Sequence, residues 1–191
     1  MTVPANFQSF FFDTYPGYFL EALPIALLVG AVYGILRFRG DHRTPLRRRV
    51  WSVLFVCYLA GLLCLVLGLK LMQNLWYFLI YHRSGGIGIQ WFTPDFQLVP
   101  DFWWHVDGER IGNIFLFLPF GVLYPLSRDN SSWGRTVLAG FACSLGIEVL
   151  QPIFGRSFDI NDIFFNTLGV LVSAPALVLL LPGRGRNGKH K

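Results

Sequence analysis

Five long apolar segments constrain the fold of this chain more than any other feature of its sequence. They cover residues 19–36, 50–69, 111–126, 135–153 and 162–181. A hydrocarbon core about 30 Å thick requires about 20 apolar residues in helical form. We therefore predict an all-α polytopic membrane helical bundle with about five transmembrane helices. The third segment is short and contains Pro119 and Gly121, which we expect to bend or weaken its helix.

The composition agrees with an integral membrane protein and not with a soluble domain. Hydrophobic residues make up 53% of the chain and charged residues 14%, a balance outside the range of ordinary soluble domains. The net charge of +5 does not indicate a nucleic-acid partner, because the basic residues flank apolar segments as topology signals do. Cys57, Cys64 and Cys143 lie inside apolar segments without a CxxC pattern or a nearby His. We therefore expect no metal site, disulfide or cofactor.

The basic residues are distributed unequally over the connections. Twelve lie on one side, namely six arginines in residues 37–49, Arg128, Arg135 and four residues in 184–191. The opposite side holds Arg83, Arg110 and Arg156. Because an excess of Lys and Arg marks the cytoplasmic side of a membrane protein, we predict that the N-terminus is outside and the C-terminus is cytoplasmic.

These predictions divide the chain into five regions. They are an extracytoplasmic N-terminal segment (1–18), two transmembrane helices with a basic cytoplasmic loop (19–81), an outer aromatic segment (82–110), a core of three transmembrane helices (111–182) and a basic cytoplasmic tail (183–191). No basic residue precedes the first apolar run, so residues 1–18 do not resemble a cleavable signal peptide. The apolar stretch 50–81 is too long for one untilted span. We expect 71–81 to continue outward or lie flat, with Lys70 reaching the interface.

Polar side chains at the ends of the last three apolar segments are the candidate binding residues. They are Arg110, Asn113, Glu148, Gln151, Arg156, Asp159, Asp162 and Asn166. Ionisable groups at membrane depth are costly and usually face protein or water, which makes them candidates for a functional site. In the predicted orientation all eight lie near the outer leaflet, with the aromatic residues 87–104 lining the access route. Glu21 and Lys70 could join them.

The spacing of these residues also permits structural roles. Glu148 and Gln151 are three residues apart and share a helix face with Ser144. Interhelical hydrogen bonds are an alternative role for Asn113, Gln151 and Asn166. Asp159 is placed to cap the fifth helix, with Asp162 at about its third position, and we expect Asn161 to be a turn residue. We predict ion pairs of Arg110 and Arg156 with Glu148, Asp159 and Asp162, or with an anionic headgroup.

Three linked motifs resemble the signature of VanZ-like membrane proteins. They are RIGNIFLFLPFG at residues 110–121, Glu-x-x-Gln at Glu148 and Gln151, and Arg-x-x-Asp-x-x-Asp-x-x-x-Asn-x-x-Gly from Arg156 to Gly169. Asn161 stands where the family often has Asp. The resemblance is clearest over residues 95–180.

The resemblance implies a protein of the bacterial plasma membrane, because the founding member is associated with low-level resistance to teicoplanin. On that basis we expect membrane lipids as surroundings and an amphiphilic ligand, either a lipoglycopeptide or a lipid-linked cell-wall intermediate. An alternative is an enzyme acting on a lipid phosphate or glycolipid, with Glu148 or an Asp as base. A second alternative is a structural scaffold. The sequence contains no recognisable nucleophile, so we predict no catalytic residue, and the oligomeric state stays open.

Overall fold

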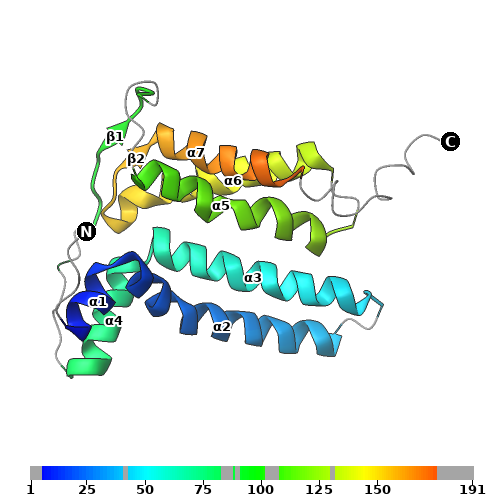
Figure 1. Ribbon diagram of the computed structural model, residues 1–191, viewed down its shortest axis with the longest axis horizontal. Helices are drawn as coiled ribbons and strands as arrows, with labels where there is room; N and C mark the ends of the chain where they lie inside the picture. The colour runs from blue at the N-terminus through cyan, green and yellow to red at the C-terminus, as the bar shows by residue number, and fades with distance from the viewer. Residues whose placement is uncertain are drawn as a thin grey trace.

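The computed structural model describes residues 6–40, 43–82, 88, 91–101, 108–129 and 132–175. The α-helices in these ranges are α1 (Phe7–Asp13), α2 (Tyr15–Gly40), α3 (Leu46–Val66), α4 (Leu69–Tyr81), α5 (Gly108–Ser127), α6 (Trp133–Leu150) and α7 (Ile160–Ser173) (Figure 1). A 3-10 helix, η1 (Gln151–Phe154), extends α6. Two short parallel strands, β1 (Phe96–Gln97) and β2 (Phe158–Asp159), pair with each other.

The helices confirm an all-α polytopic membrane bundle. Four of them are long and apolar enough to cross a membrane, namely α2, α3, α5 and α6 together with η1, and they coincide with the first four predicted segments. The fifth helix, α7, begins where expected. Its 14 residues are about 21 Å long at 1.5 Å per residue, and the predicted continuation beyond residue 175 lies outside the described residues.

A break separates α4 from α3 within the long apolar stretch. Helix α3 ends at Val66, and α4 begins at Leu69. Figure 1 shows α4 beside α1, running at a steep angle to α2 and α3. Residues 71–81 therefore do not extend α3 in a straight line. The segment before α2 is also helical, because the Asn6 side chain caps α1 and Ser9 completes a capping box.

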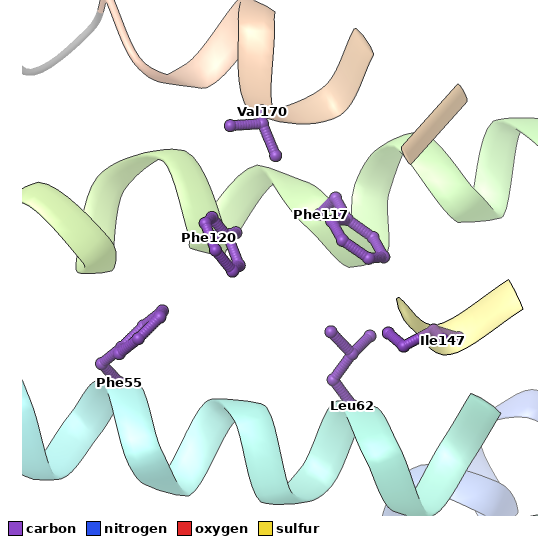
Figure 2. Close-up of a cluster of buried hydrophobic side chains, with 6 residues drawn as sticks. All are labelled: Phe55, Leu62, Phe117, Phe120, Ile147 and Val170. Carbon is purple, nitrogen blue, oxygen red and sulfur yellow. The ribbon is translucent and has the colours of Figure 1, made fainter. Parts of the chain in front are cut away.

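The apolar core joins α3, α5, α6 and α7. Its buried side chains are Phe55, Leu62, Phe117, Phe120, Ile147 and Val170. Figure 2 shows Phe55 and Leu62 pointing from α3 toward the phenylalanines of α5, with Val170 on the other side of α5. The Phe55 and Phe120 rings meet edge to face at 5.3 Å between centroids, a favoured aromatic geometry. This core sets the relative positions of the helices that carry the polar motifs.

Glycines allow α7 to lie close to its two neighbours. A Cβ at Gly169 would be 2.4 Å from the Ile114 carbonyl oxygen of α5, and one at Gly121 would be 2.8 Å from the Val170 carbonyl oxygen. Gly140 of α6 makes room for the Val170 side chain, whose Cγ2 would be 2.6 Å from a Cβ there. Small residues permit this close packing of helices in membranes.

The predicted weakening of the third helix at Pro119 does not take the form of a break. Helix α5 continues through Pro119 and Pro125. The Tyr58 hydroxyl of α3 donates a hydrogen bond of 2.7 Å to the Leu116 carbonyl, near Pro119. This contact ties α3 to α5 one residue beyond Phe115, whose carbonyl is the one that loses its helical donor to Pro119.

The two ends of the bundle differ in charge, as the sequence predicts. The arginine-rich end comprises the C-termini of α2 and α5 and the N-termini of α3 and α6 (Figure 1). There Arg48 pairs with Asp129, and the Ser52 hydroxyl donates to the Ser127 carbonyl. The opposite end contains α1, α4, η1 and both strands.

Candidate functional site

All eight candidate residues lie at the end of the bundle opposite the arginine-rich end. Two come from the start of α5, two from the junction of α6 and η1, two from the connection to α7 and its cap, and two from the first turns of α7. We call this set the polar cluster: Arg110, Asn113, Glu148, Gln151, Arg156, Asp159, Asp162 and Asn166. The fold therefore gathers residues that are up to 56 positions apart in the sequence.

Arg110 forms an ion pair that the sequence does not predict. It is buried, with 8% of its surface exposed, and its Nη2 donates to Asp101 Oδ1 at 2.5 Å. Asp101 lies just outside the N-terminus of α5, in a segment with neither apolar periodicity nor a motif to mark it. The ion pair fastens that segment to α5.

Two amide side chains join α7 to its neighbours. Asn113 Nδ2 on α5 donates to Asp162 Oδ1 on α7 at 2.7 Å. Asn166 Nδ2 on α7 donates to the Ser144 hydroxyl on α6 at 2.9 Å, and both of these residues are buried. Each amide thus donates a hydrogen bond to a neighbouring helix, which is the interhelical role considered for Asn113 and Asn166.

Glu148 is fully buried at the centre of the cluster. Its Oε2 accepts a hydrogen bond of 3.1 Å from the Asp159 backbone N–H. Arg156, Asp159 and Asp162 are close enough to act on its charge. Its other oxygen, Oε1, has no hydrogen-bond partner among the described residues.

The close ion pairs of the two arginines are with residues other than Glu148, Asp159 and Asp162, although Arg156 acts on the charge of Glu148 and both arginines act on that of Asp162. Pairing with an anionic headgroup stays a prediction. Arg110 pairs with Asp101, as described above, and Arg156 Nη2 faces Glu109 Oε1 at 3.4 Å. Arg156 Nη1 also faces the Val66 carbonyl at 3.4 Å. The carboxylates in direct contact with the guanidinium groups belong to residues just outside the motifs.

Three buried polar atoms of the cluster have no hydrogen-bond partner in the described part of the chain. They are Glu148 Oε1, Gln151 Nε2 and Asn166 Oδ1. Gln151 is 1% exposed and Asn166 is 3% exposed, so the cost of leaving these atoms unpaired is not relieved at the protein surface. The cluster therefore retains one amide donor and two acceptors at the junction of α6 and α7.

The start of α7 is organised as predicted at two residues and differently at a third. Asp159 is the N-cap, and its side chain accepts from the Asn161 backbone N–H at 2.8 Å. Asp162 is in the first turn, as expected. The prediction that Asn161 is a residue of a turn outside the helix is wrong, because Asn161 is buried in the first helical turn of α7. It accepts from the Asp101 backbone N–H at 3.1 Å and donates to Asp159.

Residues 91–101 form a covering segment that lies along η1 and β2. The Thr93 N–H donates to the Pro152 carbonyl at 2.8 Å, and the Phe158 N–H donates to the Asp95 carbonyl at 2.9 Å. The Trp91 ring lies 6.0 Å from that of Phe154. Phe92 and Phe96 of the predicted access route are exposed, and Phe102, Trp103 and Trp104 lie outside the described residues.

Other candidate groups lie elsewhere or do not form a site. Glu21 is packed against α1 and α4, where the Trp76 indole donates to its backbone carbonyl at 2.9 Å. Within the described ranges, no three His, Cys, Asp or Glu side chains come together in a way that could hold a metal ion. The three cysteines are free.

A comparison with known families identifies the family of this chain. The chain matches the VanZ/LLP1 family over residues 55–181, about two thirds of its length. The protein belongs to the VanZ-like family. No curated protein and no solved structure matches it.

The VanZ-like motifs contribute both packing and polar groups to the site. Gly121 and Gly169 bring α5 and α7 into backbone contact, and Asn113 and Asp162 form a hydrogen bond between the same two helices. Glu148, from the second motif, binds the backbone of the third motif at Asp159. The matched region thus includes the whole polar cluster, whereas α1 and α2 precede it.

Proposed function

We propose that this VanZ-like membrane protein binds the headgroup of an amphiphile at the outer face of the bacterial plasma membrane. The ligand would be a lipoglycopeptide or a lipid-linked cell-wall intermediate, and binding would contribute to teicoplanin resistance or envelope homeostasis. The observation that carries this proposal is the set of three unpartnered atoms on Glu148, Gln151 and Asn166. Buried polar groups normally have partners, and a ligand headgroup with both donors and acceptors would supply them.

The charges around the cluster favour a headgroup that is rich in hydrogen-bond donors. Five carboxyl groups surround two guanidinium groups, and they belong to Asp101, Glu109, Glu148, Asp159 and Asp162. Both arginines already face a carboxylate, so the excess charge is negative. Amine, amide and hydroxyl groups would therefore be attracted more strongly than a second anion. Arg156 is held only by contacts of 3.4 Å, so it is the cation that an anionic group on the ligand would engage.

The outward orientation rests on the charge difference between the two ends of the bundle. The arginine-rich end carries Arg37, Arg39, Arg43, Arg47, Arg48, Arg49, Arg128 and Arg135, which favours a cytoplasmic location. The polar cluster lies at the other end. An amphiphile could then keep its tail in the outer leaflet while its headgroup contacts α5, α6 and α7.

Binding by the Glu148→Gln and Arg156→Ala variants tests the proposal. Purified protein in lipid nanodiscs would be titrated with teicoplanin and, separately, with an undecaprenyl-linked cell-wall precursor. Removing a hydrogen bond to a charged group costs about 1.5–3 kcal/mol, so Glu148→Gln is expected to raise Kd by about 10- to 150-fold. Asp129→Asn, at the arginine-rich end, is the matched control and should bind as the wild type does.

Growth under teicoplanin provides the cellular test of the same variants at equal membrane abundance. Loss of protection by Glu148→Gln and Arg156→Ala, with protection kept by Asp129→Asn, is the expected result. If the cluster variants bind the ligand and protect cells as well as the wild type does, the polar cluster is not the binding site. If they lose only thermal stability, the polar cluster is a structural scaffold. Turnover of the precursor that disappears in Glu148→Gln would instead make the protein an enzyme.

A further inference from the structure

A second buried carboxyl group lies outside the polar cluster and outside the region matched to the family. Glu21, in the second turn of α2, has no exposed surface. Neither of its carboxyl oxygens has a hydrogen-bond partner among the described residues. The Gln73 amide, whose Nε2 donates to the Phe12 carbonyl at 3.0 Å, also acts on the Glu21 carboxyl as a weak hydrogen-bond donor, but it carries no charge. Glu21 is therefore enclosed without a counter-charge.

The groups that enclose Glu21 belong to a cap made of α1 and α4. Phe12 of α1 and Met72 and Gln73 of α4 are buried. The Phe11 ring meets the Trp76 ring edge to face at 5.9 Å, and the Trp76 indole binds the Glu21 backbone carbonyl. Because these contacts join α1 and α4 to the start of α2, Glu21 lies where the cap is attached.

The charged and titratable side chains on the surrounding elements do not neutralise Glu21. They are Asp13 on α1, Tyr15 and Tyr18 on α2, Cys64 on α3, and Lys70, Tyr77 and Tyr81 on α4. Tyr18 is close enough to interact with the Glu21 charge, but a phenol hydroxyl cannot compensate a carboxylate. The exposed Asp13 has the same sign as Glu21. An isolated buried carboxylate is among the most costly arrangements in a protein.

We propose that Glu21 is a proton-binding site that attaches the α1–α4 cap to the bundle. A proton is a ligand that can reach an oxygen buried on all sides without displacing the cap. In the protonated state the carboxyl is neutral and can donate a hydrogen bond, so the enclosed arrangement is stable. Loss of the proton places an unpaired charge between α1, α2 and α4, and the cap then separates so that water can reach it. The cap is thus attached at low pH and released as pH rises.

Hydrogen–deuterium exchange of the full-length protein in nanodiscs tests this proposal. Exchange in α1 and α4 would be measured from about pH 6 to about pH 9, a range that includes known titrations of buried Glu, and corrected for intrinsic exchange. In the wild type we expect corrected exchange in both helices to rise about tenfold across the range, while exchange in α5 stays constant. Glu21→Gln keeps the size and removes the titration, so its cap should remain protected throughout. Asp13→Asn, an exposed carboxyl of the cap, should behave as the wild type does.

Three results would overturn the proposal. The first is constant corrected exchange in the wild type, and the second is the same pH dependence in Glu21→Gln as in the wild type. The third is a Glu21→Gln cap that is already unprotected at low pH, because a neutral side chain of equal size should hold it. None of these measurements depends on the polar cluster or its ligand.

Discussion

Replacing Gly169 with alanine is expected to separate α5 and α7 without changing any polar group. The new Cβ would lie 2.4 Å from the Ile114 carbonyl oxygen, whereas ordinary contact begins at 3.4 Å. The two helices must therefore move apart by about 1 Å. Because the neighbouring atom belongs to the backbone, no change of rotamer can relieve the overlap. Ile114 follows Asn113, so the same movement also strains the hydrogen bond from Asn113 to Asp162.

The expected loss of stability follows from the size of this overlap. Forcing an extra methyl group into a close-packed contact costs about 1–3 kcal/mol. A chain of this length shifts its unfolding midpoint by about 2–4 °C for each kcal/mol. Gly169→Ala should therefore lower Tm by about 2–12 °C.

Thermal unfolding in detergent, followed by near-ultraviolet circular dichroism, measures the shift. Gly112→Ala is the matched control because it lies on α5 and no atom of a neighbouring element is within 4 Å of its Cβ position. That variant should leave Tm unchanged or raise it, since alanine favours a helix over glycine by about 1 kcal/mol. A Tm for Gly169→Ala equal to that of the control would refute the inference that glycine permits the contact.

Three further predictions concern the polar cluster. Asp159→Ala should lower stability by about 0.5–2 kcal/mol through loss of the α7 cap, and Asp159→Asn should retain most of it; chemical denaturation of both variants in detergent measures the difference. A double-mutant cycle of Asn113→Ala and Asp162→Ala should give a coupling of about 0.6–1.7 kcal/mol, and a coupling of zero would contradict the interhelical bond. Gln151→Leu should keep or raise Tm because it removes an unpaired buried amide, while teicoplanin binding by the nanodisc protein falls. A fall in Tm with unchanged binding would show that Gln151 stabilises the fold and does not bind the ligand.

Local sequence patterns predict the helices and the cap of α7, but not the partners of the arginines. The spans follow from runs of apolar residues, and Asp159 is recognisable as a cap from the residues beside it. Arg110 and Arg156 also stand out in the sequence. Their actual partners, Asp101 and Glu109, cannot be predicted in this way. The first contact depends on the path of the connection between α4 and α5, and the second on how the segment before α7 lies against the start of α5.

The same limitation applies to Asn161 and to the break before α4. Asn161 is buried because the covering segment returns to the start of α7 and presents its Asp101 N–H there, a contact between residues 60 positions apart. The break at Leu67–Gly68 lies inside an unbroken apolar run, and only Gly68 marks it. The length of the apolar stretch predicts that residues 71–81 lie beyond the span. Hydropathy measures the environment of a residue and not the direction of its helix, so it could not choose between continuing outward and lying flat.

The energetics of the polar cluster distinguish its structural contacts from its candidate binding groups. The donors of Asn113 and Asn166 are used between helices, so these bonds repay part of the cost of burying the two amides. No hydrogen bond within the described residues offsets the cost of burying Glu148 Oε1, Gln151 Nε2 and Asn166 Oδ1. At about 1–3 kcal/mol for each unpaired group, they cost about 3–9 kcal/mol, a large part of the 5–15 kcal/mol typical of a folded domain. Apolar side chains at Glu148 and Gln151 would fasten α6 to α7 without that cost. Fastening the bundle therefore explains the amide donors, whereas the three atoms without a partner among the described residues are the groups that the proposed headgroup would contact.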